Sequence, residues 1–311
     1  MRYNNNELFL LSLFFTTTAL ITIISLGFPI INAESIDNNN NELTIIFLGV
    51  GQGDSTLIIF PNQKTMLIDG GERGQSDTII SILEEYNIEK INSVVATHPH
   101  TDHIGGLLGI IQNVPIDKIY DSGQEHNTQT FENYLDLIES KRIPFNLARE
   151  NNEIDDLDSK VDIKILNPPE PLFVGTGNDI NDNSIVLKLS YGNFSILMTG
   201  DIGEIPEERL VVNNENIKNI DILKVPHHGS KFSSTIEFLH SVNPQIAIIS
   251  VGENNRYGHP DLETLERLEN QESIDHIFRT DIDGTTILIT DGNQYAMKSL
   301  DTNEIIHYIL N

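Results

Sequence analysis

The segment 98–103, His-Pro-His-Thr-Asp-His, limits what this chain can fold into more than any other segment. The apolar run 91–97 before it is typical of a buried strand, and the run 104–113 after it is typical of a short helix. Three imidazoles and one carboxylate therefore gather at a turn from a strand to a helix. Because α/β folds place their chemistry at the carboxyl ends of strands, this turn predicts an α/β fold with a site at a sheet edge.

Other polar clusters also follow directly after predicted strands. They are Asp69 after 65–68, Asp201 after 194–199, the cluster 227–230 after 221–225, and the cluster 256–259 after 245–251. Clusters at so many strand ends predict a single site at one edge of the sheets. The strands and helices fall into two halves of similar style, which predicts two packed sheets with helices outside.

The apolar runs and turn signals between these clusters define the remaining elements. The expected strands are 43–48, 56–60, 65–68, 91–97, 116–120, 161–166, 184–189, 194–199, 221–225, 245–251, 285–290 and 294–298, and the expected helices are 76–86, 104–113, 130–142, 234–242 and 261–270. The last two strands flank Asp291-Gly292, which is a strong signal for a hairpin.

The polar clusters contain ligands for divalent metal ions. The chain has no Cys, so a metal site must use His, Asp, Glu or Asn, a set that suits zinc, manganese or iron. We expect two ions, with zinc favoured. His98 and His100 can point into one ion, and Asp102 and His103 can reach a second. Asp201 is the natural bridging carboxylate between them.

A further ligand is expected from the neighbouring residues His227 and His228, of which only one is expected to reach the metal. We favour His227, because it lies nearer the strand end, and place His228 on the substrate side. Asp69 ends a buried strand beside two glycines, so we expect it to hold the histidine turn in place by hydrogen bonds.

Residues beside the predicted ligands suggest how a substrate is bound. Ser230 and Lys231 can bind an anionic oxygen, and Arg256 follows the last core strand. His259 can act as a general acid or as a last metal ligand. We therefore place Asp102, His228 and His259 in the catalytic set, and Ser230, Lys231 and Arg256 in the substrate-binding set.

The net charge of −27 restricts the substrate. A field of this sign repels polyanions, so it argues against a processive, high-affinity DNA binder. A phosphoester remains compatible, because metal ions supply positive charge locally. The acidic surface therefore favours small or short substrates.

The first part of the chain differs from the rest. The segment Leu8–Ile31 is almost wholly apolar or Ser/Thr, which is typical of an export signal or a membrane anchor. We expect residues 1–33 to be a signal peptide or anchor, residues 34–42 a polar linker, and residues 43–311 the catalytic domain. The domain would then act outside the cytoplasm, either secreted or anchored.

The motif His98-x-His100-x-Asp102-His103, together with Asp69 and Thr199-Gly200-Asp201, resembles the signature of metallo-β-lactamase-fold hydrolases. The runs 47–55, 224–231 and 257–260 are similar to a narrower group, the extracytoplasmic nuclease-like domain of the DNA-uptake protein ComEC and its free-standing relatives. A more distant resemblance is to the phosphorylcholine esterases of this fold.

This resemblance implies a four-layer αββα sandwich of two mixed sheets and hydrolysis by a metal-bound hydroxide. The sequence departs from the family at its third motif, where Asn178–Asn183 contains no His. Without this His, the first metal would lack a ligand or take an Asn or Asp oxygen instead, so the resemblance does not imply full occupancy of both metal positions, the second included. DNA transport is not implied, because the multi-spanning channel of the DNA-uptake protein has no counterpart here.

The leading hypothesis is a metal-dependent hydrolase of phosphodiesters, a nuclease or phosphodiesterase. The alternatives are a lactonase or β-lactamase-like amide hydrolase of the same fold, and a surface module that only retains metal. The expected partners are a small or short phosphoester, single-stranded nucleic acid and, through the anchor, a membrane. No feature of the sequence indicates a protein partner.

Overall fold

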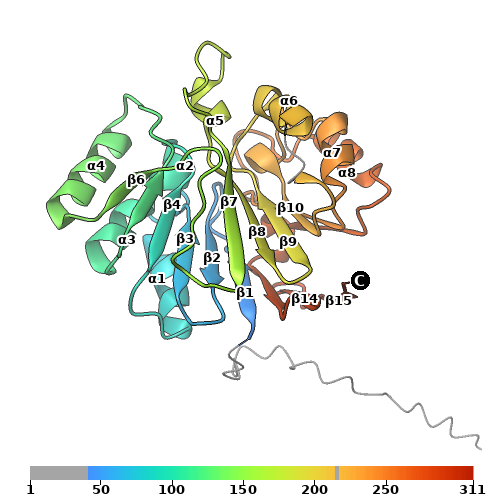
Figure 1. Ribbon diagram of the computed structural model, residues 1–311, viewed down its shortest axis with the longest axis horizontal. Helices are drawn as coiled ribbons and strands as arrows, with labels where there is room; N and C mark the ends of the chain where they lie inside the picture. The colour runs from blue at the N-terminus through green and yellow to red at the C-terminus, as the bar shows by residue number, and fades with distance from the viewer. Residues whose placement is uncertain (1–40, 214–216, 311) are drawn as a thin grey trace, which may run out of the picture. The chain divides into compact units, whose positions relative to one another are not determined.

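Two mixed β-sheets form the framework of the protein (Figure 1). The structure is a computed structural model that describes residues 41–213 and 217–310. Within those residues, the larger sheet has nine strands in the order β15 (Ile305–Ile309), β14 (Gln294–Ser299), β13 (Thr286–Thr290), β1 (Leu43–Phe47), β2 (Thr56–Ile59), β3 (Thr65–Ile68), β4 (Ser93–Ala96), β5 (Ile119–Asp121) and β6 (Phe145–Leu147). The smaller sheet has the order β12 (His276–Arg279), β11 (Ile246–Ile249), β10 (Ile222–Lys224), β9 (Phe194–Met198), β8 (Val186–Tyr191) and β7 (Val161–Asn167).

Each sheet combines an antiparallel part with a parallel part. Strands β15 to β3 pair antiparallel, and β3 to β6 pair parallel. In the smaller sheet, β7 to β9 pair antiparallel and β9 to β12 pair parallel. The carboxyl ends of β3 and β4 are therefore neighbours in one sheet, and those of β9, β10 and β11 are neighbours in the other.

Helices cover the outer face of each sheet (Figure 1). The first half of the chain supplies α1 (Ser76–Glu85), α2 (Thr101–Ile104), α3 (Leu107–Asn113) and α4 (Gln129–Lys141). The second half supplies α5 (Asp179–Asp182), α6 (Glu204–Asn213), the 3₁₀ turn η2 (Pro226–Gly229), α7 (Ile236–Val242), α8 (Leu262–Glu269) and α9 (Thr280–Asp283).

Alternating side chains on the strands build separate apolar cores. In β1, Ile45 and Phe47 face a core shared by both sheets, whereas Ile46 faces a core shared with α1, α3 and α4. In β9, Ile196 faces the core between the sheets, whereas Leu197 packs toward α6, α7 and α8. Since the central strands of both sheets are covered on both faces, the layers follow the order αββα, and the predicted fold class is confirmed.

The expected strands and the final hairpin are present, with some elements added. The hairpin pairs Thr290 with Tyr295 and joins the larger sheet, because β13 pairs with β1. Strands β6, β12 and β15 and helix α6 were not expected from the sequence. Strand β6 is exposed along its whole length, and the ten-residue helix α6 contains Pro206. The four-residue helices α2, α5 and α9 were not expected either.

The expected leader over residues 1–33 lies outside the described residues, and so does most of the linker 34–42. Only Asn41 and Glu42 of that linker are described. None of the helices in residues 41–213 and 217–310 combines the length and the apolar character that a bilayer-spanning helix needs.

Candidate metal centre

The histidine turn begins directly after β4 and continues into α2. His98 and His103 are buried, and His98 Nε2 lies 3.0 Å from His100 Nδ1. The glycines behind this turn permit its close packing: a Cβ at Gly106 would lie 2.0 Å from the carbonyl oxygen of Gly70. The turn is thus pressed against the segment that follows β3, and its imidazoles face one space.

Asp69, at the end of β3, fixes the orientation of His103. Its Oδ1 accepts the backbone N–H of Thr97 (2.8 Å), and its Oδ2 accepts the Thr97 hydroxyl (2.6 Å). The same Oδ2 lies 2.7 Å from His103 Nδ1. With Nδ1 engaged in this way, His103 Nε2 is the ring nitrogen left to face the site.

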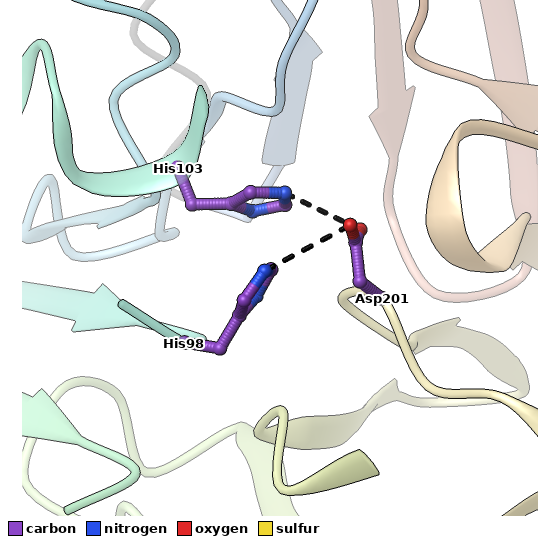
Figure 2. A group of neighbouring side chains, drawn as sticks. All are labelled: His98, His103 and Asp201. Atoms are coloured by element: carbon purple, nitrogen blue, oxygen red, sulfur yellow. Dashed lines mark ion pairs between the residues drawn. The ribbon is translucent and has the colours of Figure 1, made fainter. Parts of the chain in front are cut away.

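Asp201 follows β9 and lies between the imidazoles. Its Oδ1 is 3.3 Å from His103 Nε2, and its Oδ2 is 3.8 Å from His98 Nε2 (Figure 2). The same Oδ2 is 3.5 Å from His228 Nε2. One carboxylate from the smaller sheet therefore faces donors of both sheets, which is the geometry of a bridging ligand.

The turn after β10 determines which of the two neighbouring histidines joins this cluster. His227 and His228 both have left-handed backbone, with φ of 50° and 53°, a conformation that stores strain and is concentrated at functional sites. His228 is buried, and its Nδ1 donates to the carbonyl of Ser250 (2.8 Å). Its Nε2 then faces Asp201 and lies 3.6 Å from Asp102 Oδ2.

His227 lies at the edge of the cluster. Its side chain is 24% exposed, and its Nε2 is 3.8 Å from Asp201 Oδ2 and 3.3 Å from Asn181 Nδ2. The groups whose donor atoms lie within 4.8 Å of one another include His228 and contain neither His227 nor His100. The geometry therefore favours His228 over His227 as the ligand, which is the reverse of the sequence-based preference. His227 is nearer the strand end, but the hydrogen bond to Ser250 directs His228 toward the other donors.

The electrostatics of the cluster follow from burial and opposed charges. Burial lowers the pKa of His98, and the neighbouring His103 lowers it further, so His98 is neutral and able to ligate. Burial alone would also lower the pKa of His103, but Asp201 and Asp69 raise it above its usual value. Burial would raise the pKa of Asp102, yet His228 and His103 hold it below its usual value.

The residues present fit a metal ion. His103 Nε2, His228 Nε2 and Asp201 Oδ1 are buried and lack a hydrogen-bond partner among the described residues. They belong to the clusters His98–His103–Asp201 and Asp102–His103–His228, whose ligand atoms converge. Unpaired buried donors and acceptors are costly, so converging ones indicate a cation that satisfies them.

A cavity of about 410 Å³ opens onto these donors. It is lined by Gln52, Glu72, His100, Thr101, Asp102, His126, Asp201, His227, His228, Arg256, Tyr257 and His259. His259 is half-buried, and its ring lies 5.8 Å from that of His227. Arg256 lies over the ring of the exposed Tyr257 at 4.8 Å.

The structure does not bring Ser230 and Lys231 to this cavity, contrary to the sequence-based expectation. Ser230 is buried, and its carbonyl accepts the hydroxyl of Thr264 (2.9 Å). Lys231 is exposed and lies over the ring of Phe232 at 5.4 Å. The left-handed turn at His227 and His228 directs the chain away from the donors before it reaches these residues.

Sequence reasoning missed several residues of the site. Gln52, His126 and Tyr257 line the cavity, and the ring of His126 lies 5.3 Å from that of His100. Asp54 and Lys224 form a buried ion pair beside the donors. Gln52 and Asp54 both lie in the run 47–55. The sequence therefore identified the motif, but it did not predict that these two residues belong to the site.

The segment that replaces the family's third-motif histidine forms α5. Asn181 is buried there, and its side chain reaches His227. Asn181 Oδ1 is buried without a hydrogen-bond partner among the described residues. An amide thus stands near the cluster where the wider family carries an imidazole.

Comparisons with known proteins agree with this geometry. Residues 48–253 match the Metallo-beta-lactamase superfamily. ComE operon protein 3 of Bacillus subtilis is 28% identical over 263 residues, which cover 79% of this chain and 33% of that protein. Recombination protein 2 of Haemophilus influenzae is 32% identical over 231 residues, or 73% of this chain and 26% of that protein.

A solved structure shows the same fold. Igni18, a metallo hydrolase from the archaeon Ignicoccus hospitalis, has a TM-score of 0.50 and 15% identity, and the match covers 86% of this chain and 100% of that one. The chain thus spans about a third or less of the curated relatives' length, but all of the solved one.

Proposed function

Because the chain belongs to the metallo-beta-lactamase superfamily, we propose that it is a metal-dependent hydrolase of phosphodiesters. The membership itself makes the chain a metallo-hydrolase, and the resemblance to the ComEC-type proteins is confirmed by the relatives found. The proposal adds the bond that is cleaved and the roles of the side chains around it.

Two groups of donors would hold two divalent ions, zinc or alternatively manganese. His98 and His100 would hold one, and Asp102, His103 and His228 would hold the other, with Asp201 between them. When bound, such ions supply an activated water and withdraw electron density from the phosphoryl group. Asp69 keeps His103 in the tautomer that ligates through Nε2.

The cavity wall is the observation that favours a phosphodiester. Of the described residues that line it, all are polar, charged or aromatic, and none is an aliphatic hydrocarbon side chain. A phosphodiester is bound mainly through polar and cationic groups, which this wall offers, whereas an acyl lactone is held mainly through apolar side chains, which it lacks. Among the described residues that line this cavity, Arg256 is the only lysine or arginine. Its guanidinium can neutralise the charge of a phosphoryl oxygen.

We assign His259 the role of proton donor to the leaving oxygen. Its Nδ1 is buried and without a hydrogen-bond partner among the described residues. The loop that carries it is fixed by Asn255, whose Oδ1 accepts the backbone N–H of both Tyr257 and His259 at 3.1 Å. A general acid needs such a fixed position within reach of the proton acceptor.

The size of the cavity and the net charge of −27 suit a small or short phosphoester, including a short single-stranded nucleic acid. We also propose that the domain acts outside the cytoplasm, on the basis of the apolar segment 8–31. The proposal includes no protein partner.

The test uses the purified full chain loaded with Zn²⁺ or Mn²⁺. Bis-p-nitrophenyl phosphate, short single-stranded DNA, a phosphorylcholine ester, an acyl lactone and nitrocefin are assayed side by side. We expect phosphodiester turnover, and a loss of at least about a hundredfold in Asp102→Ala, because groups that merely support metal ligands are already worth 10- to 100-fold. The matched control is Asp117→Ala, an exposed aspartate paired with Lys90.

The outcomes separate the alternatives. Turnover of nitrocefin or the lactone without phosphodiester turnover would overturn the proposal in favour of an amide or lactone hydrolase. A metal-loaded protein that is inert toward every substrate would overturn it in favour of a metal-retaining binding module.

A further inference from the structure

Asp54 and Lys224 form a buried ion pair between the two sheets. Asp54 lies in the loop after β1, and Lys224 is the last residue of β10. Lys224 Nζ lies 2.7 Å from Asp54 Oδ1 and 2.8 Å from Oδ2, and the two residues are 3% and 5% exposed. The ammonium donates to Oδ2 and lies beside Oδ1, which is buried and has no hydrogen-bond partner among the described residues.

Asp54 is also part of the donor cluster. One of its oxygens groups with ligand atoms of Asp201 and His228, all within 4.8 Å of one another. The backbone fixes it there, because its N–H donates to the carbonyl of Asp102 (3.1 Å) and its own carbonyl accepts the N–H of Gly71 (2.8 Å). Asp54 is thus a fourth carboxylate at the centre, beside Asp69, Asp102 and Asp201.

Lys224 is an unusual residue in this position. Among the residues that the structure describes, it is the only lysine or arginine that is buried. A buried charge carries a large desolvation cost, which only a well-placed partner offsets. Burial alone would raise the pKa of Asp54, but Lys224, with His228 and His103, holds it below its usual value, so the carboxylate is ionised.

We propose that the Asp54–Lys224 pair sets the metal affinity of the centre on its His228 side. Lys224 offsets the charge of Asp54 and so weakens the attraction of this fourth carboxylate for a cation. Asp54 in turn shields a bound cation from the ammonium of Lys224. Both are positioning residues, since neither lines the cavity that would hold the substrate.

The proposal predicts opposite effects for the two halves of the pair. Neutralising Asp54 leaves an ammonium facing the cation, whereas neutralising Lys224 leaves an additional carboxylate. At a separation near 5 Å, one unit charge changes the affinity for a divalent ion by more than about tenfold, even at the dielectric constant of water. Removing both charges should return the affinity close to that of the wild type.

The experiment measures the affinity of the metal-free full chain for Zn²⁺ and Mn²⁺ by competition with a chromophoric chelator. We expect more than about tenfold weaker binding in Asp54→Asn and more than about tenfold tighter binding in Lys224→Met. The double variant should lie within about threefold of the wild type, and Lys224→Arg should keep the wild-type affinity. Glu207→Gln is the matched control, because it neutralises a fully buried carboxylate that binds the N–H groups of Ser234 and Thr235.

A purely structural pair would give a different pattern. Single variants that shift the affinity in the same direction, or that match Glu207→Gln, would overturn the proposal. Should Lys224→Met fail to fold by circular dichroism, the double variant decides: recovery relative to Asp54→Asn supports the proposal, and equal weakness contradicts it. The inference deepens the metal centre of the proposed function, yet its readout is metal affinity, so a wild type inert toward phosphodiesters would leave this result intact.

Discussion

Asp69→Asn tests whether the site depends on the orientation of one imidazole. In the wild type, Asp69 Oδ2 lies 2.7 Å from His103 Nδ1, and both residues are buried. An asparagine keeps the shape but loses the charge, and its amide must place an NH₂ toward either His103 or Thr97. A hydrogen bond to a charged group contributes about 1.5–3 kcal/mol, which corresponds to about 10- to 150-fold in affinity.

We therefore expect Asp69→Asn to bind Zn²⁺ or Mn²⁺ about 10- to 100-fold more weakly, which is the range for outer partners of metal-ligating histidines. Chelator competition measures this affinity, and urea unfolding of the metal-free variant measures the accompanying loss of stability. Asp117→Asn serves as the control, because its side chain is 44% exposed and is paired with Lys90 rather than with a histidine. Wild-type affinity in Asp69→Asn would refute the reasoning that Asp69 sets the His103 tautomer.

The remaining predictions concern three separate regions. His228→Ala should lower the metal content per chain by elemental analysis, since its Nε2 faces two carboxylates, whereas His227→Ala should retain it; equal loss in both would contradict our assignment. Burial raises the pKa of Glu207 from 4.5 to about 7, so the folded state binds this proton more tightly than the unfolded state does. The free energy of unfolding should therefore fall by about 1.4 kcal/mol per pH unit as the pH rises between these two values. Urea unfolding should show this slope lost in Glu207→Gln and kept in the exposed control Glu204→Gln. Arg256→Ala should raise KM for a phosphodiester about tenfold with little change in kcat, and an unchanged KM would remove Arg256 from substrate binding.

Most of the fold could be predicted because its strands are apolar runs between strong turn signals. The fully buried strand β11 consists only of Ile and Ala, so it has no polar position to obscure the pattern. Strand β6 could not be predicted, because its three residues are exposed and are held only by pairing with β5. Strand β15 was missed although its sequence, Ile-Ile-His-Tyr-Ile, itself favours a strand, and it pairs with β14.

The candidate site could be predicted only in part, for a physical reason. A strand end identifies which side chains reach the edge of a sheet, and this rule placed His98, His103 and Asp201. It cannot order two neighbours such as His227 and His228, because their directions depend on backbone torsions. Those torsions lie in the left-handed region, and two adjacent histidines do not predict a left-handed backbone.

Contacts between the sheets were the least predictable feature. Asp54 and Lys224 are 170 residues apart, and each taken alone is an ordinary charged residue near a strand end. They form an ion pair only when the two sheets pack and bring the loop after β1 against the end of β10. The same packing brings Asp201 and His228 from the smaller sheet to His98 and His103 of the larger one.

The two-sheet origin of the donors couples metal binding to the packing of the sheets. The larger sheet supplies the histidine turn and Asp69, and the smaller sheet supplies Asp201 and His228. A cation held by both would therefore stabilise the interface beneath it, in addition to satisfying the unpaired buried atoms. The apolar core between the sheets packs together the strands whose ends carry the donors. The Asp54–Lys224 pair crosses the same interface, which is why its two charges can act on the centre without touching the substrate cavity.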